Sequence, residues 1–217
     1  MKKILFLTIL FLYIAFSAHA ADTLFVKQPN IPILIDRQDN VLFYIQLDAK
    51  NTQLLNSLKL QFGKNVALKE IASVKLYYAG TEGVQRKGKR YYSPVTYISS
   101  HTPNQTKKAN SSYSMLIAEQ KSPCKDVVFE VDYTLFPGVN YFWVSLEMKP
   151  DAPLLSKVDA KIVAATMDAQ KALISFEGEQ HCRRLGIGVR HAGDDGAAAF
   201  RIPGLVTSRK GTLLGVY

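Results

Sequence analysis

The chain has 217 residues, of which 47% are hydrophobic and 21% are charged. This composition is typical of a folded globular protein and excludes a largely disordered, collagen-like or multi-span membrane chain. The length predicts one or two domains. Lys and Arg number 27 against 18 Asp and Glu, which gives a net charge of +9. Positive charge favours anionic partners in general, without choosing among nucleic acid, anionic lipid and acidic sugars.

Residues 1–20 have the organisation of an export signal. Lys2 and Lys3 provide a positive start, and an uncharged apolar run of thirteen residues follows at 4–16. That run is shorter than the roughly 20 residues of a membrane-spanning helix. The small residues Ala18 and Ala20 predict that a signal peptidase cleaves before Ala21. A transmembrane anchor is the alternative. We expect an exported protein without a stable membrane anchor, in the periplasm, at the cell surface or in the medium.

Export would place the two cysteines in a compartment where disulfides persist. They are Cys124 and Cys182, and the chain has no others, so a single pairing is possible. The sequence leaves open whether that bond forms.

Positive charge is concentrated at 86–90 (RKGKR), directly before Tyr91 and Tyr92. Basic residues beside aromatic residues can bind single-stranded nucleic acid. Gly88 within the run and the exported context favour a solvated hairpin tip instead. We therefore expect no nucleic-acid partner.

The dominant hydrophobic period along the chain is two, which is typical of β-strands. The alternation is clearest at 41–47 and 141–148. Shorter strand-like runs occur at 58–62, 74–78, 95–98, 113–117, 127–135, 158–165 and 173–176, with turn residues between them. Only 51–60 and 66–72 favour short helices. The pattern predicts an all-β fold in which residues 21–180 form an N-terminal β-sandwich.

The composition changes after about residue 180. Seven of the thirteen glycines fall in the last 32 residues, and 205–217 has the pattern of strand, turn and strand. A two-stranded hairpin is marginally stable on its own. We therefore predict that 181–217 is a linker followed by the opening of a second all-β domain, and that the chain is an N-terminal fragment. The alternative is a complete small adhesin whose last hairpin pairs with the preceding domain.

Common catalytic and metal-binding signatures are absent or broken. There is no Gly-x-Ser-x-Gly, no His-Glu-x-x-His and no cysteine pair at zinc spacing. His101, His181 and His191 share no metal-ligand spacing. Residues 83–89 have the spacing of a phosphate-binding loop, but Arg90 stands where that loop needs Ser or Thr. Residues 194–196 (DDG) could ligate a cation, although a charged turn is the favoured interpretation.

One stretch near the end carries more specific information. Phe200-Arg201-Ile202-Pro203 precedes a strand and a glycine turn. It resembles the Phe-Arg-Ile-Pro motif that opens the six-bladed catalytic β-propeller of bacterial exo-α-sialidases. Residues 33–43 and 136–143 also resemble the domain before the propeller in sialidases of Bacteroides-type bacteria. The resemblance covers essentially the whole mature chain.

The resemblance implies a glycoside hydrolase that removes terminal sialic acids from glycoproteins, glycolipids and oligosaccharides, with no metal or organic cofactor. By the same resemblance, Arg201 is the first of three arginines that bind the sialic acid carboxylate, and Phe200, Ile202 and Pro203 support it. A guanidinium meets a carboxylate in bidentate geometry and stays ionised. In the alternative, Arg201 is an exposed arginine at a strand end.

The resemblance also implies catalytic residues that these 217 residues lack. The family uses a tyrosine nucleophile assisted by a glutamate, with an aspartate as acid/base, and all three lie further along the chain. Sialidases are exceptions to the usual two-carboxylate scheme of glycosidases. We expect the chain of 217 residues to be inactive alone.

A second function class remains open for residues 21–180, namely a non-catalytic carbohydrate-binding or adhesion module. Its candidate sugar platform is aromatic: Tyr77, Tyr78, Tyr91, Tyr92 and Trp143. Alternatively, these side chains fill the domain interior and its contact with the propeller. The oligomeric state is not predicted.

Overall fold

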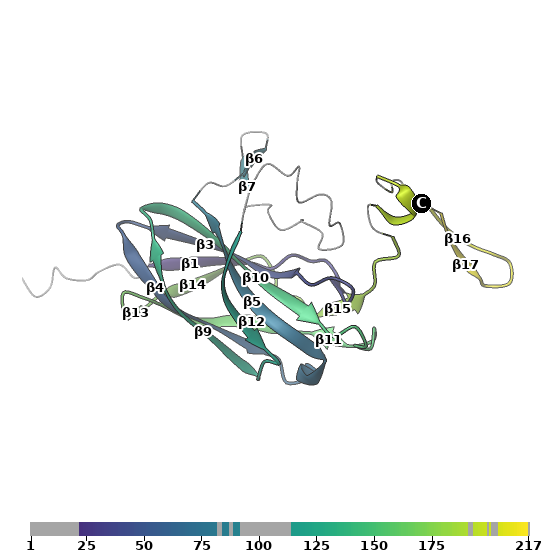
Figure 1. Cartoon of the computed structure of the whole chain (residues 1–217), viewed down its shortest axis with the longest axis horizontal. Coiled ribbons are helices and arrows are strands. Elements are labelled where there is room, and N and C mark those ends of the chain that lie inside the picture. Colours follow the sequence, from purple (N-terminus) through teal and green to yellow (C-terminus); the bar gives the residue numbers. More distant parts are fainter. Residues whose placement is uncertain are drawn as a thin grey trace, which may run out of the picture.

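The computed structural model describes residues 22–81, 84–86, 89–91, 114–190, 193–198, 200 and 204–216. These residues form an all-β fold of several open sheets (Figure 1), which confirms the predicted class. Within these ranges the strands form no closed propeller. The predicted signal at 1–20 and the predicted strand at 95–98 lie outside the described residues. No helix in the described part is long and apolar enough to cross a membrane.

The largest sheet has six strands in the order β14-β1-β3-β10-β5-β8. They are β1 (Thr23–Lys27), β3 (Asn40–Ala49), β5 (Ile71–Gly80), β8 (Met115–Lys121), β10 (Gly138–Met148) and β14 (Leu173–Glu177). β10 lies at the centre and pairs antiparallel with both β3 and β5. β1 and β14 form the one parallel pair in this sheet.

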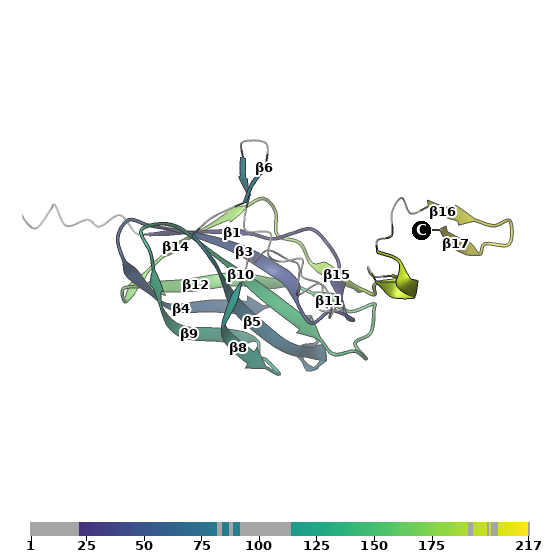
Figure 2. The ribbon, with the colours of Figure 1, turned by 45° about the horizontal axis from the view of Figure 1, so that its top comes forward.

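A second sheet has four strands in the order β13-β12-β4-β9. They are β4 (Gln53–Phe62), β9 (Asp126–Leu135), β12 (Ala160–Met167) and β13 (Gln170–Lys171). The two sheets lie as two layers (Figure 2), and their facing side chains form one core. We call this unit the two-sheet domain.

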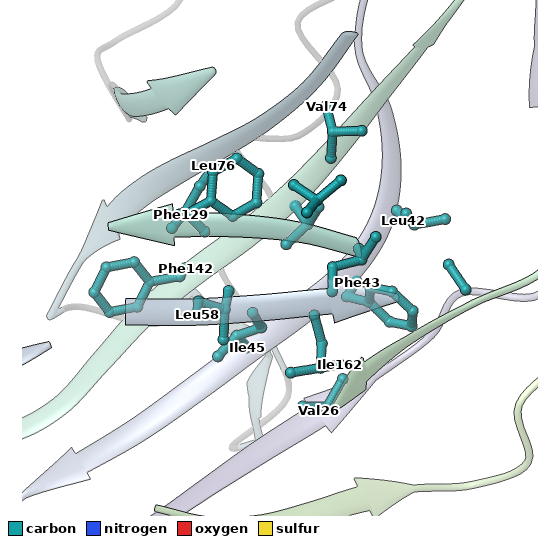
Figure 3. Close-up of a cluster of buried hydrophobic side chains, with 14 of the residues drawn as sticks. Val26, Leu42, Phe43, Ile45, Leu58, Val74, Leu76, Phe129, Phe142 and Ile162 are labelled. Carbon is teal, nitrogen blue, oxygen red and sulfur yellow. The ribbon is translucent and has the colours of Figure 1, made fainter. Parts of the chain in front are cut away.

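Alternation along the strands explains the core. On β3, Phe43 and Ile45 are at most 1% exposed, whereas Tyr44 between them is half-buried. Figure 3 shows Phe43, Ile45 and Phe142 of the larger sheet gathered with Leu58 and Ile162 of the smaller one. Because side chains on a strand alternate between its two faces, a period of two places one apolar row against the opposite sheet.

The prediction of short helices at 51–60 and 66–72 was wrong. Residues 53–62 form β4, and residues 68–70 form only a 3₁₀ turn, η1 (Leu68–Glu70). The pairing of β4 with β12 shifts register between Ser57 and Leu55, which face the consecutive residues Thr166 and Met167. Such an irregularity places an extra residue in one strand. Leu55 and Leu58, three residues apart, can therefore both be buried in the core, and this spacing imitates a helix.

A third, small sheet joins the beginning of the predicted linker to the two-sheet domain. Its strands are β2 (Ile33–Leu34), β11 (Lys157–Val158) and β15 (Arg183–Gly186). β15 lies between the other two, antiparallel to β11 and parallel to β2. The chain after residue 181 therefore does not leave the domain at once.

Two predicted hairpins are confirmed. β6 (Val84–Arg86) and β7 (Lys89–Tyr91) pair antiparallel around the basic run. β16 (Gly204–Thr207) and β17 (Leu213–Val216) pair antiparallel near the end. The turn between the latter contains Gly211 at φ +81°, a conformation that glycine adopts without strain.

Cys124 and Cys182 are both exposed, and they are not bonded to each other. We therefore expect both thiols to react in the native, unreduced protein. Mass spectrometry after treatment with a maleimide should show two adducts per chain. A protein that gains adducts only after reduction would contradict this expectation and would indicate a disulfide.

Candidate functional site

The site residues predicted by resemblance are only partly described. Arg201, Ile202 and Pro203 lie outside the described residues. Phe200 is described and is half-buried. The hairpin that follows it carries exposed apolar side chains, among them Leu205, which is 75% exposed. The role of Arg201 therefore stays a prediction.

Residues 194–196 form a charged turn, as the sequence favoured. They make a short 3₁₀ turn, η4 (Asp194–Gly196), and the Arg190 Nε lies 3.0 Å from an oxygen of Asp195. Arg190 thus forms an ion pair with one of the carboxylates that a metal cation would need. In the described parts of the chain no group of three or more His, Cys, Asp and Glu could hold a metal ion.

A buried polar cluster lies on the face of the large sheet opposite the core. Lys75 of β5 is 9% exposed, and its Nζ lies 2.9 Å from Glu147 Oε2 and 3.6 Å from Asp39 Oδ1. The Tyr77 hydroxyl and the Ser145 hydroxyl donate to the same Asp39 oxygen at 3.0 and 2.8 Å. One lysine thus faces two carboxylates. We call these five residues the Lys75 cluster.

The electrostatics of the Lys75 cluster are those of a structural site. Burial disfavours the charged form of Lys75, but the hydrogen bond to Glu147 and the charge of Asp39 outweigh it, so the pKa of Lys75 is raised. Burial and then Asp39 raise the pKa of Tyr77. Both groups therefore hold their protons near neutral pH, and neither can act as a base or nucleophile there. The cluster fastens the loop before β3 to β5 and β10.

Replacing Lys75 by Met should destabilise the two-sheet domain by about 1–3 kcal/mol, because two partly buried carboxylates would lose their shared hydrogen-bonding cation. The matched control is Lys59→Met, since Lys59 pairs with Asp126 at the surface, where both side chains are about 40% exposed. Exposed pairs contribute roughly 0–1 kcal/mol. Urea unfolding at pH 7 measures both variants.

The sign of the pH effect gives a second readout of this prediction. The pKa of Lys75 is higher in the folded protein than in the unfolded chain. Its contribution to stability is therefore fully present below the pKa of the unfolded chain, and it is lost as pH rises through the pKa of the folded protein. The stability difference between wild type and Lys75→Met should therefore not be lost to lysine titration between pH 6 and 9. Equal stability of the Lys75→Met and Lys59→Met variants would contradict the structural role.

Of the aromatic candidates for a sugar platform, Trp143 is buried, and Tyr77 and Tyr78 are half-buried. Tyr77 and Trp143 stack with ring centroids 4.2 Å apart and planes 8° apart. Trp143 is 5% exposed, and its indole N–H donates to Ser114 Oγ at 2.8 Å. Tyr78 contacts Tyr133 and Phe142. Trp143 therefore has no open ring face for a sugar. The side chains of Tyr91 and Tyr92 lie outside the described residues.

Sequence reasoning missed Arg183, which is 3% exposed. Its Nε donates to the Ile31 carbonyl at 2.7 Å, and its Nη1 donates to the Val41 carbonyl. Burial lowers the pKa of Arg183 to about 10, so the side chain remains positive at neutral pH. Its hydrogen bonds in the described chain all run to backbone carbonyls, more than 140 positions away. Arg183 therefore acts as a clamp between β15 and the segments around β2 and β3.

A cavity of about 140 Å³ lies beside this clamp. Its lining combines apolar and polar residues: Ile31, Pro32, Leu34, Arg37, Asp39, Asn40, Val41 and Arg183. Ligand pockets usually measure roughly 300–1,000 Å³. The Asn40 amide is already occupied, since it donates to the carbonyls of Leu34 and Leu146. The cavity is therefore too small to be a sialic acid site.

Comparisons with known proteins show which family the chain belongs to. The family model of the N-terminal domain of BNR-repeat neuraminidase matches residues 21–171. A sialidase of Bacteroides fragilis (strain YCH46) is 55% identical over 222 aligned residues, which cover 100% of this chain and 40% of that protein. The structure of Hadza microbial sialidase Hz136 matches with a TM-score of 0.72 and 41% identity, over 88% of this chain and 37% of that one.

The chain thus spans well under half the length of the sialidases that it matches. The family match covers most of the described two-sheet domain. This chain belongs to the family of BNR-repeat neuraminidase N-terminal domains.

Proposed function

We propose that this chain is the N-terminal part of an exported exo-α-sialidase. Residues 1–20 would be the signal peptide, 21–180 the β-sandwich domain and 181–217 the linker with the first strands of a six-bladed propeller. The observation that carries the proposal is the 55% identity to a sialidase along the whole chain, the final hairpin included. A match confined to the two-sheet domain would have supported only a shared accessory module.

The proposed substrates are sialylated glycans, from which the whole enzyme would release the terminal sugar. Arg201 would bind the sialic acid carboxylate, because a guanidinium offers two parallel N–H donors in the geometry of that group. The strand β16 begins at Gly204, directly after the motif. The nucleophile and the acid/base would come from residues beyond 217, so the chain of 217 residues alone should release no sialic acid.

The intact mass of the native secreted product tests the proposal. This chain has a mass of 24.2 kDa and corresponds to 40% of the related sialidase, so division by 0.40 gives about 60 kDa. We expect a mass near that value, less the signal peptide. A product slightly lighter than 24.2 kDa would overturn the proposal, because the remaining catalytic residues would not exist.

A further inference from the structure

We propose that one end of the two-sheet domain is an interface for the polypeptide that follows residue 217 in the longer protein. This surface, the linker end, consists of Ile31, Leu154, Leu155, Ile187 and Val189 with the outer face of the sheet β11-β15-β2. The proposal rests on the proposed function, since that function supplies the polypeptide. Three observations carry it.

The first observation is a group of exposed apolar side chains. Leu155 is 91% exposed, Val189 is 68% exposed and Ile187 is 54% exposed. Their segments lie side by side, because the Leu185 N–H donates to the Ser156 carbonyl at 3.3 Å. Figure 1 shows β11 and β15 together at the end of the domain from which the chain continues toward β16. Gathered apolar surface of this kind marks an interaction site.

The second observation is a pair of like charges on the same small sheet. Lys157 and Arg184 are direct partners in the antiparallel pair of β11 with β15, and both are exposed. Like charges opposite each other destabilise a sheet. No ion pair to either residue is formed by the described carboxylates. The other face of this sheet is buried, as Ile33, Val158 and Leu185 show. The partner surface should therefore be apolar with a carboxylate at its edge.

The third observation identifies the occupant. The chain is fixed to the linker end just before it leaves, by the Arg183 clamp and by the Gly188 N–H, which lies 3.2 Å from both carboxylate oxygens of Asp36. The polypeptide that follows the linker therefore starts next to this surface, and its effective concentration there is high. The related sialidase has 60% of its length outside the matched part. A following domain in the same chain is thus favoured over a second copy.

Hydrogen–deuterium exchange of the full-length protein and of the 217-residue chain tests the interface. Peptides covering 154–157 and 184–190 should exchange at least tenfold more slowly in the full-length protein. Peptides around Phe136, which is 52% exposed, should exchange equally in both. Phe136 is the control because it lies far from the linker end. It comes two residues before Gly138, which pairs with Ala49 at the last position of β3. Equal exchange of the linker-end peptides would overturn the proposal.

A pair of variants separates the interface from general stability. Leu155→Asp should lower the melting temperature of the full-length protein and leave that of the 217-residue chain unchanged, because Leu155 is almost fully exposed there. Phe136→Asp should not distinguish the two proteins. If the 217-residue chain instead forms a dimer that Leu155→Asp dissociates, the occupant is a second copy and the proposal is wrong.

None of these readouts needs catalysis. A full-length sialidase with an unprotected linker end would overturn the interface alone, and a protected linker end in an inactive protein would overturn the proposed activity alone.

Discussion

Arg183→Met is expected to lower the free energy of unfolding of the 217-residue chain by about 3 kcal/mol. Arg183 donates to the Ile31 and Val41 carbonyls from a site where it is 3% exposed. Hydrogen bonds from charged donors contribute roughly 1.5–3 kcal/mol each. Removing the buried charge recovers part of its desolvation cost, which keeps the expected loss near the lower end of the sum. Urea unfolding provides the measurement.

The neighbouring residue supplies the control. Arg184 is exposed and faces Lys157 across the pair of β11 with β15, so Arg184→Met should not destabilise the chain and should raise its stability by at most about 1 kcal/mol. In a domain of this size, a loss of 3 kcal/mol corresponds to a fall in Tm of roughly 6–12 °C. If both variants are as stable as the wild type, Arg183 is not a clamp, and β15 is held by its backbone pairing alone.

Arg201→Ala in the full-length protein is expected to lower kcat/KM for a sialoside by at least about 30-fold. A buried carboxylate left without its charged partner costs roughly 2–5 kcal/mol, and every 1.4 kcal/mol is a factor of ten. The kcat/KM of Arg201→Lys should lie between those of the wild type and Arg201→Ala, because lysine keeps the charge but cannot form the bidentate pair. Steady-state kinetics with a fluorogenic sialoside measures all three proteins.

Arg209 is the matched control for Arg201. It lies in the turn between β16 and β17, eight residues further along, and it is exposed. Arg209→Ala should therefore retain the activity of the wild type. Unchanged kinetics in Arg201→Ala would remove the role assigned to that residue, even if the protein is a sialidase.

Much of the fold could be predicted because its strands follow simple alternation. The runs at 41–47 and 141–148 became β3 and β10, which pair at the centre of the large sheet. β10 also shows the limit of that reasoning, because Trp143 and Ser145 on its second face are 5% and 0% exposed. Alternation indicates which residues share a face, but the segments that cover a face are distant in the sequence.

The buried charged residues that sequence reasoning missed depend on such distant partners. Arg183 and Arg184 are chemically identical neighbours, and only the carbonyls of residues 31 and 41 decide which of them is buried. Lys75 lies in an apolar run, and its buried state follows from Glu147 on the neighbouring strand. By contrast, the Phe-Arg-Ile-Pro motif at 200–203 could be found because its information is local and needs no partner.

The release of free sialic acid tests the central claim most directly. The full-length product and the 217-residue chain would each be incubated with an α-linked sialoside, and the released sugar would be quantified. Release by the full-length product and none by the 217-residue chain is the predicted result. A full-length product that releases no sialic acid from α2,3-, α2,6- or α2,8-linked substrates, or a 217-residue chain that releases it alone, would contradict the account.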